Sequence, residues 1–215
     1  LPFLLALYMF GIGKAALMPF HSWLPAAMVA PTPVSALLHA VAVVKAGVFT
    51  VLKVIVYIFG IDFLSATGAS TWLIWVASFT LLVSSLVALS KDNLKARLAY
   101  STVSQLSYIV LAAALATKLS ILGAGLHIAT HALGKITLFM CAGAIYVASR
   151  KTEISDMDGL GRVMPFTFIA FAIGAFSIIG LPPFAGVWSK WYMALGAANL
   201  ELYLVIAVYM VSSLL

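Results

Sequence analysis

The sequence predicts an all-α, polytopic membrane protein. Hydrophobic residues make up 64% of the 215 residues and charged residues only 8%, against about 25% in soluble domains. Apolar runs near 20 residues recur, the length of a membrane-spanning helix, whereas a membrane β-strand needs only about 10 alternating residues. The 12 basic residues give a net charge of +6 but are spread through hydrophobic segments, which excludes the basic patch of a nucleic-acid-binding protein.

Seven helical spans are predicted from the apolar runs and from the residues that interrupt them. Proline and glycine stand at most junctions because both residues interrupt helices. The chain begins without methionine and ends within an apolar run, so we expect residues 1–215 to be one transmembrane domain of a longer chain. In order, the spans are 3–18, 33–59, 71–90, 98–117, 119–149, 165–197 with a break, and 200 onward.

Basic loop residues predict the orientation of these spans, because lysine and arginine favour cytoplasmic loops. Segments 91–97 and 150–162 each contain three basic residues. Two predicted helices separate these segments, so both should face the same side of the membrane. The opposite side offers only Lys118, and we therefore expect the group of six to be cytoplasmic.

Two of the spans are interrupted by prolines in similar sequence contexts. Pro19 is followed by Trp23, and the Pro182–Pro183 pair is followed by Trp188. In the predicted orientation these broken spans run in opposite directions, which is typical of inverted repeats. Transporters built in this way place ion sites near the midplane, where the helices break.

The prolines should also free backbone groups at each break. We expect Pro19 to open the helix directly after Lys14, because proline clashes with the carbonyl four residues earlier. By the same reasoning Pro182 and Pro183 should free the carbonyls of Ile178 and Ile179. These groups then need protein or water partners, since lipid offers none.

Four lysines lie inside or beside the breaks of apolar spans, where each costs about 2.5–3.5 kcal/mol at the bilayer centre. Such residues normally line ion or proton pathways. A proline kink that only shapes packing is the alternative at each break, but a lysine near both breaks favours a functional role. The four are Lys14, Lys45, Lys135 and Lys190.

One span carries a titratable stripe. His127, His131 and Lys135 follow one another at steps of four, which places them on one slowly drifting face of a helix. Histidine titrates near neutral pH, so protons could hop along this face. Either histidine alone could instead be a hydrogen-bonded core residue. A zinc pair is the weaker alternative, because the segment supplies no acidic ligand and a lysine follows one turn later.

The preceding polar pair is less clearly assigned. His39 and Lys45 lie six positions apart, which turns them about 120° from each other on a helix. Which of the two conducts is left open. No carboxylate lies in the middle of a predicted span, and the single cysteine, Cys141, can form neither a disulfide nor a thiolate cluster.

Several ordered motifs resemble the antiporter-like proton-channel subunits of respiratory complex I, multisubunit Na+/H+ antiporters and membrane-bound hydrogenases. The resemblance covers nearly the whole chain. The segments that carry it are 13–14, 19–28, 30–40, 92–95, 98–105, 127–132 with Lys135, 180–183 and 189–190.

The resemblance implies a role for each titratable residue. Lys14 matches a lysine on the first broken helix that pairs with a glutamate of an earlier helix. Lys45 and His39 match central polar positions of the next helix, and Lys190 matches the terminal site on the second broken helix. The remaining proton-pathway positions are His127, His131 and Lys135.

We therefore expect residues 1–215 to be a proton-conducting transmembrane domain of a redox-driven complex in the inner (plasma) membrane. Its expected partners are other membrane subunits and lipid, with no nucleic acid. Haem or iron–sulfur ligands are absent in useful arrangements, so we expect no cofactor and a non-redox subunit. The alternatives are a subunit of a Na+/H+ antiporter, a stand-alone solute transporter, a structural hydrogenase anchor and, last, a membrane metalloenzyme. The parent complex and any transport of sodium are left open.

Overall fold

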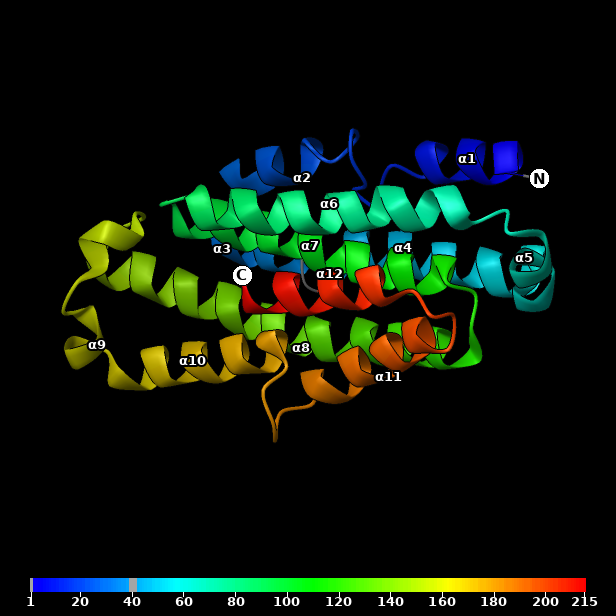
Figure 1. Cartoon of the computed structure of the whole chain (residues 1–215). Helices are drawn as coiled ribbons and strands as arrows, with labels where there is room; N and C mark the ends of the chain where they lie inside the picture. The colour runs from blue at the N-terminus through cyan, green and yellow to red at the C-terminus, as the bar shows by residue number, and fades with distance from the viewer. Residues whose placement is uncertain (1, 39–41) are drawn as a thin grey trace.

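The structure is a computed structural model that describes residues 2–38 and 42–215. These residues form a bundle of helices lying side by side along a common direction, with no strand among them (Figure 1). Among these residues, two helices are both long and apolar enough to span a membrane: α6 (Thr71–Ser90) and α8 (Lys118–Ser149). A third candidate span is the pair Val43–Phe59 and Ile61–Thr67, which is bent by 79°.

Apart from α7 (Leu94–Ala114), which has 21 residues, the remaining helices are shorter, and the count of seven crossings stays a prediction. Helix α4 continues into a π-helical segment at Val54–Phe59. The other helices are α1 (Pro2–Gly11), α2 (Trp23–Ala26), α3 (Thr32–Ala36), α4 (Val43–Lys53), α5 (Ile61–Thr67), α7 (Leu94–Ala114), α9 (Leu160–Val163), α10 (Pro165–Ile179), α11 (Gly186–Ala198) and α12 (Tyr203–Leu214), with short 3-10 turns at Ala27–Val29 and Ile154–Met157.

Helix α7 is the centre of the bundle. It packs against α6, α8 and α4, and its side chains from Thr102 to Ala114 are buried. The Asn93 side chain caps its N-terminus by accepting a hydrogen bond from the Ala96 amide at 3.1 Å. Polar side chains in this part of α7 therefore have no access to lipid and must find partners within the bundle.

Helices α8 and α11 approach closely because glycines lie between them. A Cβ atom at Gly123 would come within 2.8 Å of the Ser189 carbonyl oxygen and of Met193, and one at Gly196 would come within 2.7 Å of Ser120. Any larger residue at these positions would force the helices apart. This contact brings the histidine face of α8 against the start of α11.

The two basic loops lie at the same end of the bundle, as predicted. The Leu94 amide donates to the Thr152 carbonyl at 3.0 Å, and the Ile154 amide donates to the Asp92 carbonyl at 3.0 Å. The Ser155 hydroxyl donates to the Asp92 carboxylate at 2.6 Å. These hydrogen bonds tie the loop before α7 to the loop after α8.

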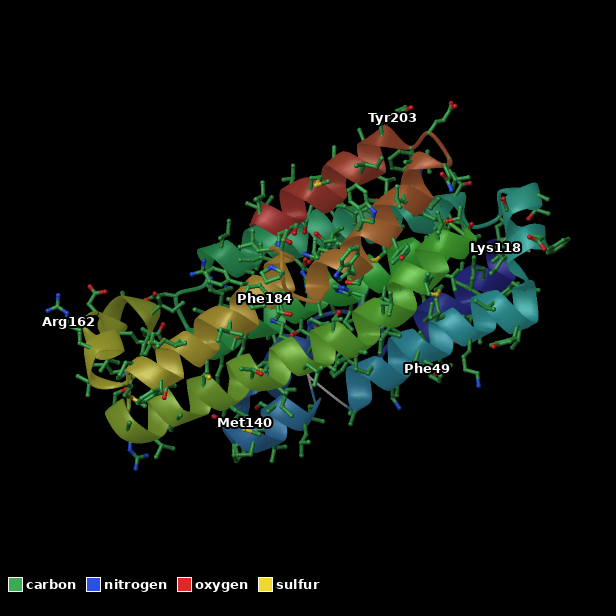
Figure 2. The ribbon with its side chains drawn as sticks, turned by 90° about the horizontal axis from the view of Figure 1, so that it is seen from below. Phe49, Lys118, Met140, Arg162, Phe184 and Tyr203 are labelled. Carbon is green, nitrogen blue, oxygen red and sulfur yellow. The ribbon has the colours of Figure 1, made fainter. Side chains whose placement is uncertain are left out.

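The two broken spans run in opposite directions, which confirms the prediction. In Figure 1, α1 runs from the α5 end of the bundle towards its middle, whereas α10 and α11 run from the α9 end towards the α5 end. Figure 2 places Phe184, in the second break, between Arg162 at one end and Lys118 at the other. Both interruptions thus lie near the middle of the bundle.

The first helix ends earlier than predicted. The expected span 3–18 is helical only to Gly11, so Lys14 lies in the irregular segment before α2 and not within a helix. Gly13 has a φ of +42° there, a conformation that glycine adopts without steric cost. Pro19 lies within this irregular segment, eight residues after the helix has ended, and does not end it.

The freed backbone groups at the breaks have side-chain partners, as expected from the absence of partners in lipid. At the first break the Trp23 indole N–H donates to the Gly13 carbonyl at 3.1 Å, and the Met18 amide donates to the Thr80 hydroxyl at 3.3 Å. At the second, α10 ends at Gly180, whose φ is +87°. The exposed Ile179 carbonyl then accepts two side-chain hydrogen bonds, described below.

Candidate functional site

A hydrogen bond between two buried side chains joins α4 to α8. Lys45 Nζ contacts Nδ1 of His131, and these side chains are 5% and 2% exposed. A neutral imidazole nitrogen accepts a proton from an ammonium group, and the reverse transfer uses the same contact. Lys45 and His131 can therefore share a single proton.

The histidines of α8 lie one above the other. The rings of His127 and His131 are stacked, with centroids 5.8 Å apart and an interplanar angle of 14°. His127 is held at both ring nitrogens: Nδ1 lies 2.9 Å from the Ser189 hydroxyl, and Nε2 lies 3.0 Å from Oε1 of Gln105. The predicted stripe of α8 is thus built into contacts with α7 and α11.

The side chain of Lys190, in the second turn of α11, reaches the second helix break. Its Nζ donates to the Ile179 carbonyl at 3.1 Å and to the Ser213 hydroxyl at 2.7 Å, and the Ser213 hydroxyl donates to the same carbonyl at 2.6 Å. The Nζ also lies 4.9 Å from the centre of the Tyr108 ring. Tyr108 in turn lies against His127, with ring centroids 5.7 Å apart, so one aromatic ring separates Lys190 from the histidines.

Lys135 continues the stripe one turn beyond His131 and is fully buried. Its Nζ donates to the Leu98 carbonyl of α7 at 3.0 Å. The Thr102 hydroxyl donates to that carbonyl too, at 2.8 Å. A backbone carbonyl is thus the hydrogen-bond acceptor for this ammonium group.

The buried lysines have no ion-pair partner among the described residues, and the carboxylates of the chain lie away from them. Asp62 is in the first turn of α5, and Glu201 lies in the turn before α12. His131 Nε2 is buried and makes no hydrogen bond within the described part of the chain. Any positive charge on the cluster therefore lacks a counter-ion among the described residues, which is costly unless its members are partly neutral.

Lys14, a predicted site residue, stands outside this cluster. Lys14 is exposed, and its side chain makes no hydrogen bond to the described residues; its backbone packs on α4, where a Cβ at Gly47 would lie 2.7 Å from the Lys14 carbonyl carbon. His39 lies outside the described residues, so its place relative to Lys45 stays a prediction.

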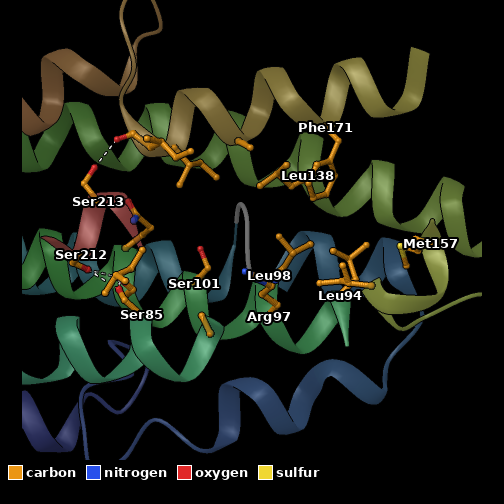
Figure 3. Close-up of a pocket in the computed structure, with 18 of the residues that line it drawn as sticks. Ser85, Leu94, Arg97, Leu98, Ser101, Leu138, Met157, Phe171, Ser212 and Ser213 are labelled. Carbon is orange, nitrogen blue, oxygen red and sulfur yellow. Dashed lines mark hydrogen bonds between the residues drawn. The ribbon is translucent and has the colours of Figure 1, made fainter. Parts of the chain in front are cut away.

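A cavity of about 360 Å³ connects the loop end of the bundle to this cluster (Figure 3). Arg97 and Met157 line it at the loop end, and Gln105 and Ser213 line it near the cluster. Three serine hydroxyls form a hydrogen-bonded group along one wall. Ser85 Oγ lies 2.8 Å from Ser104 Oγ and 2.6 Å from Ser212 Oγ.

The sequence did not identify four residues that position this cluster. The motifs that carried the resemblance include Gln105 and Ser189, but neither was given a role. Tyr108 and Ser213 gave no signal beyond polarity within an apolar helix. Such polarity is itself informative, because a polar side chain on a buried helix needs a partner.

The histidines are poorly placed to bind a metal ion. Both ring nitrogens of His127 already have side-chain partners, and one nitrogen of His131 contacts Lys45. The described residues contain no group of three histidine, cysteine or acidic side chains that could hold one. The geometry favours hydrogen bonding of these rings to neighbouring side chains over metal coordination.

Comparison with known proteins points to one family. A family profile described as NADH:quinone oxidoreductase/Mrp antiporter, transmembrane, matches residues 2–215. NADH-quinone oxidoreductase subunit N of Desulforudis audaxviator is 37% identical over 211 residues, a match that covers 95% of this chain and 41% of that protein. The chain thus spans about two fifths of this relative.

Two solved assemblies contain chains of the same fold. A chain of the membrane-bound sulfane sulfur reductase, an archaeal respiratory membrane complex, superposes with a TM-score of 0.88 at 32% identity, over 98% of this chain and 43% of that one. A chain of the Mrp complex from Dietzia sp. superposes with a TM-score of 0.89 at 27% identity, over 98% and 39%.

Proposed function

Because the chain belongs to the NADH:quinone oxidoreductase/Mrp antiporter transmembrane family, we propose that it carries protons through the membrane along its buried lysines and histidines. The whole protein is an antiporter-like subunit that works within a larger complex in the inner (plasma) membrane. Other membrane subunits supply the energy, and this chain holds the proton-exchanging side chains.

A single observation carries the proposal: titratable side chains from three helices form a connected buried group. Lys45 of α4 contacts His131, His131 stacks on His127, and His127 reaches α11 through Ser189, the neighbour of Lys190. Buried charged residues in membranes are costly and rarely lack a functional role. Polar side chains that only stabilise packing need not contact one another in a continuous series.

The cluster has the properties of a proton path. Each lysine or histidine exchanges a proton when its charged form is disfavoured, and burial without a counter-ion disfavours that form. Moving one charge through 100 mV is worth about 2.3 kcal/mol, which is similar to the energy of adding or removing a nearby charge. A charge that appears or disappears beside the cluster is therefore sufficient to shift protons along it.

The cavity lined by Arg97, Gln105 and Ser213 gives protons access from the basic loop face. Its serine hydroxyls both donate and accept hydrogen bonds, as proton exchange requires. Lys14 lies at the other helix break, where its exposed side chain makes no hydrogen bond to the described residues. Its place beside α4 suits a partner carboxylate from another helix of the full protein, as in the family resemblance.

Neutralising the two break lysines tests this function. In the complete complex reconstituted in vesicles, Lys14→Ala and Lys190→Ala should each abolish proton translocation while the complex still assembles. Lys118→Ala is the matched control, because Lys118 is exposed at the N-terminus of α8 and lies outside the cluster. Normal translocation by both break variants would refute the proposal.

Sodium/proton exchange is the second candidate function, and the likeness to a chain of the Mrp complex favours it. Cation exchange would use the same proton path but would need a second route for sodium. Measuring 22Na uptake by the vesicles separates the two functions. Sodium uptake that depends on Lys190 would favour the antiporter, whereas proton movement without sodium uptake would favour the redox-driven complex.

A further inference from the structure

His127 sits between two side chains that can each change their hydrogen-bonding role. Ser189 Oγ lies 2.9 Å from His127 Nδ1 and also 2.9 Å from the Gly186 carbonyl oxygen. A hydroxyl has one proton, so Ser189 either donates to Gly186 and accepts from Nδ1, or turns and donates to Nδ1. Gln105 has an equivalent choice at Nε2, because its amide offers an acceptor oxygen and a donor nitrogen.

The two choices correspond to the two neutral tautomers of the ring. With hydrogen on Nε2, the ring donates to Gln105 Oε1 and accepts from Ser189. With hydrogen on Nδ1, the ring donates to Ser189, and the Gln105 amide turns to donate its N–H to Nε2. The protonated ring donates on both sides, to the Ser189 hydroxyl and to Gln105 Oε1, while Ser189 donates to Gly186. Every state of His127 is thus fully hydrogen-bonded.

The ring nitrogens also face different surroundings. Nδ1 points to Ser189 on α11, beside Lys190, whereas Nε2 points to Gln105 on α7, which lines the cavity. The face of the ring stacks on His131 and cannot exchange a proton, because protons are carried only at the ring nitrogens. Any proton that passes through His127 must therefore pass the Ser189 or the Gln105 contact.

We propose that Gln105 and Ser189 are positioning residues that set which nitrogen of His127 carries the proton. The Nε2–H tautomer leaves Nδ1, beside Ser189, free to accept a proton, and the Nδ1–H tautomer leaves Nε2, beside Gln105, free to accept one. This inference rests on the proposed proton path and names two residues that direct it.

The two contacts predict opposite effects of two substitutions. Gln105→Met removes the partner of Nε2 and leaves Ser189 at Nδ1, so the Nδ1–H tautomer should predominate. Ser189→Ala removes the partner of Nδ1 and leaves Gln105 at Nε2, so the Nε2–H tautomer should predominate. In each case the ring keeps its hydrogen where an acceptor remains, because an unpaired buried N–H is unfavourable.

The tautomers are measured by 15N solid-state NMR of histidine-labelled complex in lipid, with His127 resonances assigned by difference from His127→Asn. Ser107→Ala is the control: Ser107 is buried on α7 and donates to the Val103 carbonyl of its own helix at 3.0 Å. We expect the Nδ1–H to Nε2–H ratio to change by about tenfold in opposite directions in Gln105→Met and Ser189→Ala, the effect of one lost hydrogen bond. The control should keep the original ratio.

Unchanged ratios in both variants, or shifts in the same direction, would overturn the positioning role. The ratio is read from the ring itself and does not depend on transport. Normal proton translocation by His127→Asn would instead overturn the proposed function and leave the tautomer result standing.

Discussion

Replacing Lys135 with methionine should stabilise the protein while it abolishes transport. Lys135 is fully buried, lacks a counter-ion among the described residues and donates to the Leu98 carbonyl at 3.0 Å. Replacing buried ionic groups with apolar residues of similar volume is often neutral or stabilising by about 1–4 kcal/mol. Leu98 would not be left unsatisfied, because the Thr102 hydroxyl donates to the same carbonyl at 2.8 Å. We expect Lys135→Met to raise the free energy of unfolding by about 1–2 kcal/mol.

Proton translocation should fall in the same Lys135→Met variant. A positioned proton-transfer group typically contributes about 10²–10⁴-fold to rate, so proton translocation by Lys135→Met should fall by about 100-fold or more. Unfolding is measured by SDS titration with circular dichroism, and translocation by a pH-sensitive dye in vesicles. Lys53→Met is the control, because Lys53 is exposed and its ammonium lies only over the Phe49 ring at 5.7 Å. Both quantities should be nearly unchanged in the control.

Two results would refute this reasoning. A loss of several kcal/mol in Lys135→Met would mean that the ammonium group is satisfied and structural. Full translocation in a stable Lys135→Met variant would place Lys135 outside the proton path and would favour a structural anchor.

Two further predictions concern the first break and the loop end. Gly47→Ala should destabilise the protein by about 1–3 kcal/mol, because the new Cβ would lie 2.7 Å from the Lys14 carbonyl carbon; Gly125→Ala, with no atom within 4 Å, should be neutral or stabilising by up to about 1 kcal/mol. Equal unfolding free energies for the two variants would contradict the close packing at Lys14. Hydrogen bonds from the Ser155 hydroxyl and amide hold the pKa of Asp92 below its usual range. Their contribution to folding stability is therefore present at neutral pH and is lost as the pH falls through that lowered pKa. Protection of the Ser155 amide against hydrogen exchange, corrected for the intrinsic exchange rate, should fall on acidification in the wild type. In Asp92→Asn this protection should be low at every pH. Protection that still depends on pH in Asp92→Asn would contradict the assignment to Asp92.

The sequence alone was sufficient for the overall layout. Paired prolines near lysines predicted two opposed breaks, and the positions of basic residues predicted that segments 91–97 and 150–162 share one end of the bundle. Both inferences depend on local chemistry: proline interrupts helices wherever it occurs, and lysine and arginine favour one side of a membrane. The step of four between His127 and His131 likewise fixed their shared face.

The position of the first break and the contacts between helices were not predictable in the same way. Helix α1 ends at Gly11, eight residues before Pro19, so the proline does not mark the end of the helix. The contacts that build the site join residues far apart in the chain, with 86 positions between Lys45 and His131 and 62 between His127 and Ser189. Local periodicity shows which face a residue occupies but not which residue of another helix lies opposite.

The stacked histidines divide the cluster into two hydrogen-bonded parts that interact mainly through charge. Lys45 and His131 form one part, and His127 with Ser189 and Gln105 forms the other. The ring centroids are 5.8 Å apart, and two unit charges at that distance repel by about 3 kcal/mol at an effective dielectric constant of about 20. This repulsion is slightly larger than the effect of about 100 mV on one charge. A proton that arrives at one part therefore favours release from the other even when no proton crosses the stack, so the proposed path does not need a hydrogen bond between the two histidines.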